Sequence, residues 1–253
     1  MSRVLAVIPA RMGSSRFPGK PLALLHGRPM IEHVYRGTAA CALLDEVVIA
    51  TCDAEIAAAA SAFGARAVMT SPSHERASDR VAEVASRCEA DVVVMIQGDE
   101  PMVHAAMIEA AVTPLIADPE VACTNLVAPI RTEAELRDPN TIKVVMAASG
   151  QALYFSREPI PTLNQKRFGP EGWFKQVCVI GFRGAALARF AALPQGPLER
   201  VESVDMLRFL ENGMAVHMVP TTIETHAVDT PDDLSRVEAL MAGRPMTAAR
   251  RGQ

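Results

Sequence analysis

Residues 4–20 read VLAVIPARMGSSRFPGK, and this stretch decides how the rest of the sequence is interpreted. Val4–Ile8 is apolar without alternation, which is typical of a strand buried on both faces of a parallel sheet. Small residues and the cations Arg11, Arg16 and Lys20 follow it. Small residues let backbone N–H groups approach phosphate oxygens, and the cations add positive charge. The stretch therefore predicts a strand followed by a phosphate-binding loop.

The loop is not a Walker loop, because Pro21 follows Lys20 where that motif requires serine or threonine. The alternative interpretation is a basic surface turn. Three cations beside glycine and serine on a single strand-to-helix turn favour phosphate binding over that alternative.

Strand and helix patterns alternate through the rest of the first half. The predicted strands are Glu46–Ala50, Ala65–Met69 and Asp91–Ile96. The predicted helices are Pro29–Ala42, Asp53–Phe63 with Asp53 as its N-cap, and Asp79–Glu89. This alternation predicts an α/β fold with a doubly wound, mostly parallel sheet. Ligands of such sheets lie at the carboxyl ends of the strands, where the loop and Asp99 both fall.

The second half is less regular. It contains the predicted strands Val121–Ile130, Ile142–Met146, Ala152–Ser156, Gln176–Phe182 and Val216–Val219. Helices are predicted at Glu202–Asn212 and Asp229–Met241, and the second has a clear start. Thr230 is its expected N-cap, Pro231 its first residue, and Asp233 completes a box-like signal. Residues 241–253 are expected to form a flexible tail.

Composition excludes several classes of protein. The net charge is −4, whereas proteins that bind nucleic acids or membrane surfaces usually carry a basic excess. We find no apolar stretch as long as a membrane span and no signal-peptide core. Five cysteines without C-x-x-C spacing suggest reduced thiols. We therefore expect a cytoplasmic protein with no nucleic-acid partner and no membrane insertion.

The loop also carries a family resemblance. The pattern Ala-Arg-x-x-Ser-x-Arg-x-Pro-Gly-Lys, which spans Ala10–Lys20, resembles the signature of sugar-acid cytidylyltransferases, and most of all the 3-deoxy-manno-octulosonate (Kdo) cytidylyltransferase family. Further blocks fit that family in order: Gly27–Ile31, Ala50–Thr51, Val94–Pro101, Lys143–Val145, Ala152–Arg157 and Val228–Leu234. The resemblance extends from about residue 4 to residue 240.

The resemblance implies that the anomeric hydroxyl of a 2-keto-3-deoxy sugar acid attacks the α-phosphate of CTP and releases pyrophosphate. Asp99 and Asp229 would hold Mg²⁺, which prefers carboxylate oxygens, and Arg11 and Lys20 would act with them in catalysis. The nucleotide-binding residues would be Ala10, Arg11, Gly13, Ser14, Ser15, Arg16, Lys20, Ser78, Arg80 and Gln97.

The same resemblance implies a single nucleotidyltransferase domain over residues 1–240. Residues 1 to about 120 would bind the nucleotide, and residues from about 121 to 240 would form a smaller sugar-binding and dimerisation lobe of a homodimer. The implied sugar-binding residues are Arg157, Gln176, Ile180, Glu202, Asp205 and Met206.

The chain departs from the family pattern on the ligand side. The loop His74–Arg80 has Arg76-Ala77 where the family usually has Ser-Gly. Gln176, Ile180 and Met206 replace the usual histidine, tyrosine and glutamine. Because lost hydrogen-bonding groups change which substrate fits, these departures favour a related sugar acid as acceptor. The alternatives are drift in packing residues, a different nucleotide, or a non-catalytic nucleotide-binding paralogue.

Overall fold

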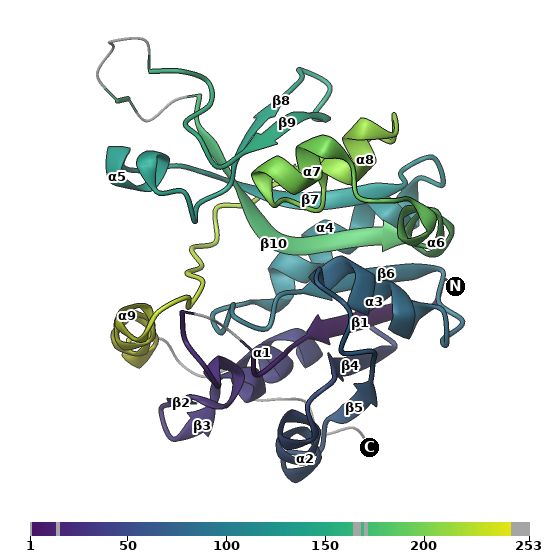
Figure 1. The fold of residues 1–253 in the computed structure, drawn as a ribbon, viewed down its shortest axis with the longest axis vertical. Helices are drawn as coiled ribbons and strands as arrows, with labels where there is room; N and C mark the ends of the chain where they lie inside the picture. Colours follow the sequence, from purple (N-terminus) through teal and green to yellow (C-terminus); the bar gives the residue numbers. More distant parts are fainter. Residues whose placement is uncertain (1, 14–15, 164–167, 170–171, 244–253) are drawn as a thin grey trace. The chain divides into compact units, whose positions relative to one another are not determined.

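The computed structural model describes residues 2–13, 16–163, 168–169 and 172–243 of the chain (Figure 1). Ser14, Ser15 and residues 244–253 of the expected tail lie outside the described residues. The chain divides into two compact units: unit 1 is Met1–Glu109 with Glu224–Gln253, and unit 2 is Ala110–Ile223. The units do not coincide with the expected parts 1–120 and 121–240, because the chain returns to unit 1 at Glu224. The assignment of the two parts to nucleotide and sugar stays a prediction.

Unit 1 contains a parallel sheet, as predicted from its apolar strands. Its order is β6 (Val92–Ile96), β1 (Val4–Pro9), β4 (Glu46–Thr51) and β5 (Arg66–Met69). Every residue of β1 and β6 is buried, which explains why neither strand alternates in polarity. The flanking helices are α1 (Met30–Ala39), α2 (Ala54–Ala62) and α3 (Ala77–Ala85). The predicted α/β class is therefore confirmed.

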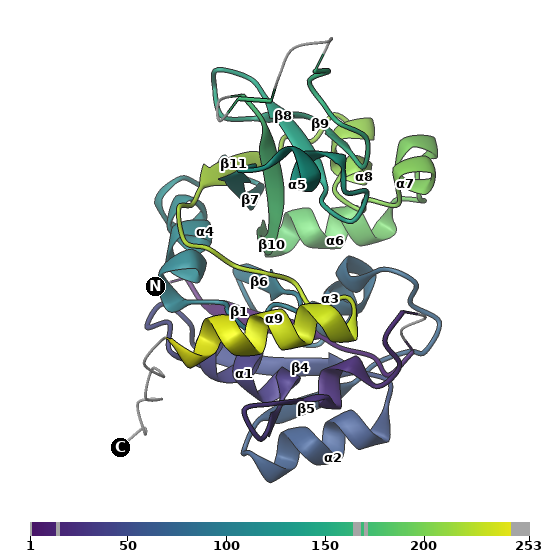
Figure 2. The same ribbon diagram turned by 90° about the vertical axis from the view of Figure 1, so that its left-hand side faces the viewer.

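Helix α9 (Pro231–Ala242) returns the chain to unit 1 and packs beside a short hairpin (Figure 2). This hairpin, β2 (Leu24–Leu25) and β3 (Arg28–Pro29), follows the 3₁₀ turn η1 (Lys20–Leu22). A small apolar cluster joins these segments and contains Leu25, Met30, Met102, Val228 and Val237.

The start of α9 is fixed by a capping box, as the sequence predicts. Thr230 Oγ1 accepts the Asp233 N–H at 3.2 Å, and the Asp233 carboxylate accepts the Thr230 N–H at 3.0 Å. The same carboxylate accepts the Asp229 N–H at 3.2 Å. The box therefore fixes the backbone on both sides of the Asp229 side chain.

Replacing Thr230 with alanine is expected to lower the free energy of unfolding by about 1 kcal/mol, the usual cost of a lost N-cap. It should also lower activity, because the Asp233 carboxylate that accepts the Asp229 N–H loses its hydrogen bond from the Thr230 hydroxyl. Thr132→Ala is the matched control, since Thr132 caps α5 (Glu133–Arg137) in unit 2 through the Glu135 N–H. Chemical denaturation and an activity assay would test both variants. Equal activity in the two variants would contradict a role for the box at Asp229.

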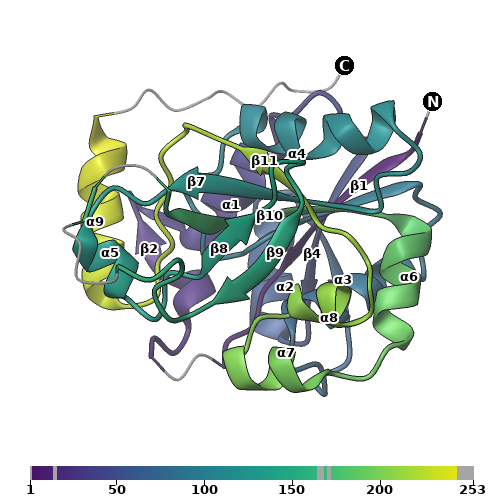
Figure 3. The same ribbon diagram turned by 90° about the horizontal axis from the view of Figure 1, so that it is seen from above.

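Unit 2 has a mixed sheet. Strand β7 (Cys123–Pro129) pairs in parallel with β11 (His217–Pro220) and antiparallel with β10 (Phe174–Arg183). Strand β8 (Lys143–Met146) pairs antiparallel with both β10 and β9 (Ala152–Ser156). Helices α6 (Gly184–Ala192), α7 (Pro197–Glu202) and α8 (Leu207–Glu211) gather on one side of these strands (Figure 3).

The predicted helix Glu202–Asn212 is wrong as a single helix. Helix α7 ends at Glu202, and Ser203 adopts a left-handed conformation with φ of 55°, which breaks the helical hydrogen-bond series before α8 begins. Helix α4 (Ala105–Ala117) was not predicted, because it is apolar on most of its circumference and contains Pro114. Within the described residues, no helix combines the length and the apolar character needed to span a membrane.

Candidate active site

The loop after β1 is held by backbone contacts and one carboxylate. The Met12 N–H donates to Asp53 Oδ2 at 2.7 Å, and the Gly19 N–H donates to the Met12 carbonyl at 3.2 Å. Gly19 has φ of 71°, a conformation that favours glycine, and it turns the chain into η1 at Lys20. Asp53 stands at the N-cap position of α2 without capping it, because its carboxylate is used by the loop. The predicted N-cap position is thus confirmed, whereas its side chain makes no capping hydrogen bond and supports the loop instead, a role that the sequence did not indicate.

Asp99 is brought to the same edge of the sheet by a close approach between two strands. It follows β6, and Gly98 lies so near β1 that an added Cβ would stand 2.8 Å from the Pro9 carbonyl oxygen. The Val228 N–H then donates to the Asp99 carbonyl at 2.9 Å. This backbone hydrogen bond places Asp229 beside Asp99, although the two are far apart in the sequence.

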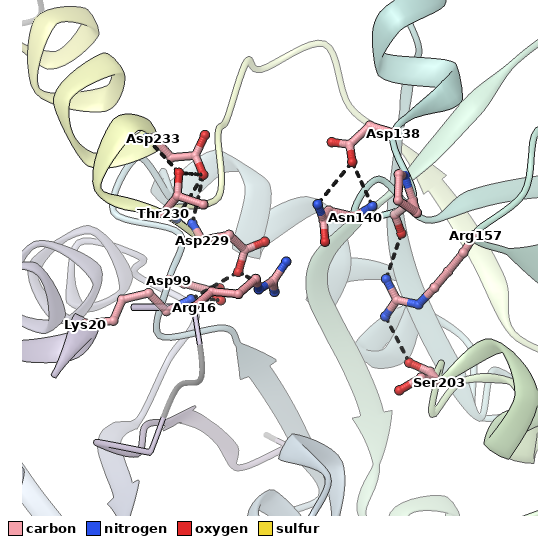
Figure 4. A network of polar contacts seen from close by, with 11 residues as sticks. Arg16, Lys20, Asp99, Asp138, Asn140, Arg157, Ser203, Asp229, Thr230 and Asp233 are labelled. Carbon is pink, nitrogen blue, oxygen red and sulfur yellow. Dashed lines mark hydrogen bonds and ion pairs between the residues drawn. The ribbon is translucent and has the colours of Figure 1, made fainter. Parts of the chain in front are cut away.

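The charged side chains converge at this point (Figure 4). Lys20 Nζ lies 2.8 Å from Asp99 Oδ2 and 3.3 Å from Asp229 Oδ1, and Arg16 Nη2 lies 2.9 Å from Asp229 Oδ1. Burial alone would lower the pKa of Lys20, but the charges and hydrogen bonds of the two carboxylates outweigh it and raise that pKa above 10.5. Lys20 is therefore a cation held between two carboxylates.

These residues line a cavity of about 290 Å³ within unit 1. Of the residues predicted to bind nucleotide or metal, the lining includes Ala10, Arg11, Gly13, Arg16, Lys20, Arg80, Gln97, Asp99 and Asp229. Five lysine or arginine residues and three acidic residues line it, as expected of a site for a polyanion. The geometry brings the predicted triphosphate half together, and its binding role stays a prediction.

The loop before α3 and the start of that helix add four residues to the cavity lining. None of them was assigned to the nucleotide from the sequence. His74, Glu75, Arg76 and Ala77 line the cavity, whereas Ser78 is fully buried and does not. Within the described part of the chain, the hydroxyl of Ser78 has no hydrogen-bond partner. Arg80 is 3% exposed and donates to Thr70 Oγ1 and, at 3.6 Å, to Cys52 Sγ.

His74 is anchored to Glu83 on α3. Burial would raise the pKa of Glu83, but the Ser71 N–H, His74 and Arg87 together lower it below its ordinary value. The Glu83 carboxylate therefore stays ionised and fixes the imidazole at the cavity wall.

The predicted sugar-binding residue Arg157 lies in unit 2, where its side chain binds backbone. Its guanidinium donates to the carbonyls of Glu202 at 2.7 Å and Pro139 at 2.8 Å. It also donates to the Ser203 carbonyl at 3.2 Å (Figure 4). The Glu202 carboxylate accepts from Ser156 Oγ at 2.8 Å, from the Arg157 N–H at 2.8 Å and from the Tyr154 hydroxyl at 3.3 Å. Both side chains thus hold the turn after α7 in place.

Lys143 is a further buried cation in unit 2. It belongs to a segment that fits the family, Lys143–Val145, and no role was assigned to it from the sequence. It is 0% exposed, and Nζ donates to the carbonyls of Thr141 at 2.7 Å, Asp138 at 2.9 Å and Arg157. Burial lowers its pKa from the ordinary value. Three backbone acceptors make this a structural lysine.

The remaining predicted sugar-side residues differ in accessibility. Ile180 and Met206 are 1% and 0% exposed, so both fit the alternative of packing residues. Gln176 and Asp205 are partly exposed. Gln176 Nε2 donates to Asn125 Oδ1 at 2.6 Å. The sugar-binding roles of all six residues stay predictions.

The donor set at Lys20 can be compared with what Mg²⁺ requires. Among the described residues, no group of three or more His, Cys, Asp or Glu side chains is placed to hold a metal. Two carboxylates do meet at one cation, the Lys20 ammonium. Mg²⁺ in nucleotide sites is commonly held by one or two carboxylates with phosphates and water, so Asp99 and Asp229 fit that ion once a triphosphate is present.

Comparison with known proteins identifies the family. The family model described as "Cytidylyltransferase" matches residues 5–218. The chain belongs to this family. It is 46% identical to the 3-deoxy-manno-octulosonate cytidylyltransferase of Syntrophotalea carbinolica, over 95% of this chain and 99% of the relative. It is 43% identical to the enzyme of the same name from Geobacter metallireducens, over 93% and 96% of the two chains. The resemblance to the Kdo cytidylyltransferase family is confirmed, and the chain is a nucleotidyltransferase.

Solved structures agree with the fold. A CMP:2-keto-3-deoxy-manno-octonic acid synthetase complexed with CTP matches with a TM-score of 0.88 and 39% identity, over 95% of this chain and 99% of that one. A putative glucose-1-phosphate thymidylyltransferase from Bacillus anthracis matches with a TM-score of 0.69 at 14% identity, over 97% of this chain and 98% of that one. The second match supports the fold alone.

Proposed function

We propose that the protein transfers CMP from CTP to the anomeric hydroxyl of Kdo and releases pyrophosphate. The observation that carries the proposal is the convergence of Lys20, Asp99 and Asp229 in a cation-rich cavity of a cytidylyltransferase. The named relatives and the CTP-bound structural match support CTP and Kdo as the substrates.

The reaction is a direct displacement at the α-phosphorus. The hydroxyl oxygen of the sugar forms a bond to phosphorus, the bond to the bridging oxygen of pyrophosphate breaks, and the hydroxyl proton passes to solvent. Arg11, Arg16 and Lys20 hold the phosphates and balance the charge that develops on the leaving group. Asp99 and Asp229 would hold Mg²⁺, which would supply further charge neutralisation at the phosphates.

The departures on the sugar side do not require a different acceptor. Ile180 and Met206 are buried, so their replacement of polar family residues is explained by packing. Gln176 is partly exposed and retains hydrogen-bonding capacity in place of histidine. Kdo therefore remains the acceptor that the comparisons support.

Pyrophosphate release with CTP, Mg²⁺ and a panel of sugar acids tests this proposal. We expect release with Kdo at a kcat/KM at least tenfold above that for the other acids, because hydroxyl-recognising sites discriminate strongly. Thermal shifts with CTP, UTP, GTP and ATP measure base selection in parallel, since bound ligand stabilises the folded protein. Turnover of another sugar acid alone would overturn Kdo as the acceptor. CTP binding without any release would favour the non-catalytic paralogue.

The family resemblance also supports a homodimer in the cytoplasm, and with Kdo as acceptor the product would serve lipopolysaccharide or capsule assembly. Light scattering in solution gives the mass of the assembly. A monomer mass at working concentrations would contradict the dimer.

A further inference from the structure

The cation site of unit 1 already contains a cation from the protein itself. Lys20 Nζ is within hydrogen-bond distance of a carboxylate oxygen from both Asp99 and Asp229, and Arg16 binds the latter as well. The side chain of Lys20 is 12% exposed, so water competes weakly with these contacts. Both predicted metal ligands are thus bound by cations of the loop that is predicted to bind the triphosphate.

A divalent ion that enters without nucleotide must compete with this ammonium. The carboxylate oxygens that it would bind, Asp99 Oδ2 and Asp229 Oδ1, accept hydrogen bonds from Lys20. Without nucleotide, no phosphate oxygen can accept the hydrogen bonds of the ammonium in their place. The ion would also stand beside an unshielded positive charge. Triphosphate oxygens remove both obstacles, because they accept the hydrogen bonds of Lys20 and bring negative charge to the ion.

We propose that Lys20 is a placeholder cation that couples metal binding to nucleotide binding. The inference rests on the proposed function of this site, and it adds a role for Lys20 before any substrate is present. Lys20 keeps the two carboxylates together and blocks divalent ions while the cavity is free of nucleotide. It then passes to the triphosphate and leaves the carboxylates to the ion that arrives with it.

Binding of Mn²⁺ to the nucleotide-free protein tests the proposal, since Mn²⁺ takes the same oxygen ligands as Mg²⁺ and its free concentration is measured by electron paramagnetic resonance. We expect Lys20→Met to bind Mn²⁺ at least tenfold more tightly than the wild type. Lys20→Arg, which keeps the charge, should bind as weakly as the wild type. Adding Asp99→Asn to Lys20→Met should remove the gain, which locates the ion between the carboxylates.

Lys175→Met is the matched control. Lys175 is likewise partly buried and bound to a carboxylate, that of Glu135 at 2.5 Å, but it lies in unit 2. Its Mn²⁺ affinity should equal that of the wild type. Thermal unfolding with and without Mn²⁺ gives a second readout, because only Lys20→Met should gain stability from the ion.

Two results would overturn the placeholder role: tight Mn²⁺ binding by the wild type without nucleotide, or no gain in folded Lys20→Met. Neither bears on CMP transfer, which is measured separately by pyrophosphate release with CTP and Kdo. A wild-type enzyme that turns over while Lys20→Met gains nothing would leave the proposed function standing and remove this inference alone.

Discussion

Replacement of Asp99 by asparagine is expected to lower kcat for CMP transfer on the order of a thousandfold, since charge stabilisation by a metal site supplies several kcal/mol. The side chain keeps its shape and loses the charge that meets Lys20 at 2.8 Å. The protein should stay folded, because Asp99 is partly exposed and its backbone contact to Val228 is unaffected. Steady-state pyrophosphate release and circular dichroism measure the two effects.

Asp91→Asn is the matched control for this variant. Asp91 and Asp99 flank the same strand, β6, but Asp91 stands before its first residue and accepts the Arg3 N–H at 2.8 Å. The control makes the same chemical change at the opposite end of the strand, so its kcat should stay within twofold of the wild type. If Asp99→Asn also stays within tenfold, Asp99 has no part in charge stabilisation.

Breaking the buried ion pair of unit 2 is expected to have the largest effect on stability. Arg208 Nε lies 2.7 Å from Glu199 Oε2, and the two side chains are 2% and 0% exposed. The Arg208 guanidinium also lies 4.2 Å from the centre of the Phe190 ring. Arg208→Met should cost about 3–5 kcal/mol of unfolding free energy, because it removes the guanidinium that neutralises the buried Glu199 carboxylate.

The double variant Glu199→Leu/Arg208→Met separates charge from packing. Replacing both partners with apolar residues removes the buried charge of Glu199. We therefore expect the double variant to recover most of the lost unfolding free energy. Arg137→Met is the surface control: Arg137 pairs with Glu133 on α5 at 2.7 Å, with side chains 60% and 49% exposed. It should change stability by less than about 0.5 kcal/mol. Urea denaturation measures the free energy of unfolding of the three variants. Equal losses for Arg208→Met and Arg137→Met would show that the buried pair stabilises the protein no more than the surface pair.

Local pattern was enough to predict the parallel strands at the centre of unit 1. Strands buried on both faces read as uninterrupted apolar runs, so β1, β4 and β6 were placed within one or two residues. The capping signal at Thr230 depends on neighbours within one helical turn, and it too was recognised. The meeting of Lys20 and Asp99 followed from the rule that parallel strands place their carboxyl ends at one edge, whereas Asp229 was grouped with them by the family resemblance.

What the sequence did not predict depends on contacts between distant residues. Nothing near Asp53 indicates that its carboxylate holds the Met12 N–H rather than its own helix. Ser203 has no local signal for a left-handed conformation, so the break between α7 and α8 went unseen. The resemblance assigns the Arg157 guanidinium to a substrate, and its contacts with three carbonyls from two other segments have no signal in the local sequence.

Unit 1 consists of two segments that lie on either side of unit 2 in the sequence, so it is completed only after unit 2 has been synthesised. Unit 2 is one continuous segment, Ala110–Ile223, and it leaves the ribosome while unit 1 still lacks Glu224–Gln253. Only then does the Val228 N–H reach the Asp99 carbonyl and bring the second carboxylate to Lys20. A nascent chain therefore carries the Arg11–Lys20 loop and Asp99 long before Asp229 joins them, because Asp229 follows the whole of unit 2 in the sequence.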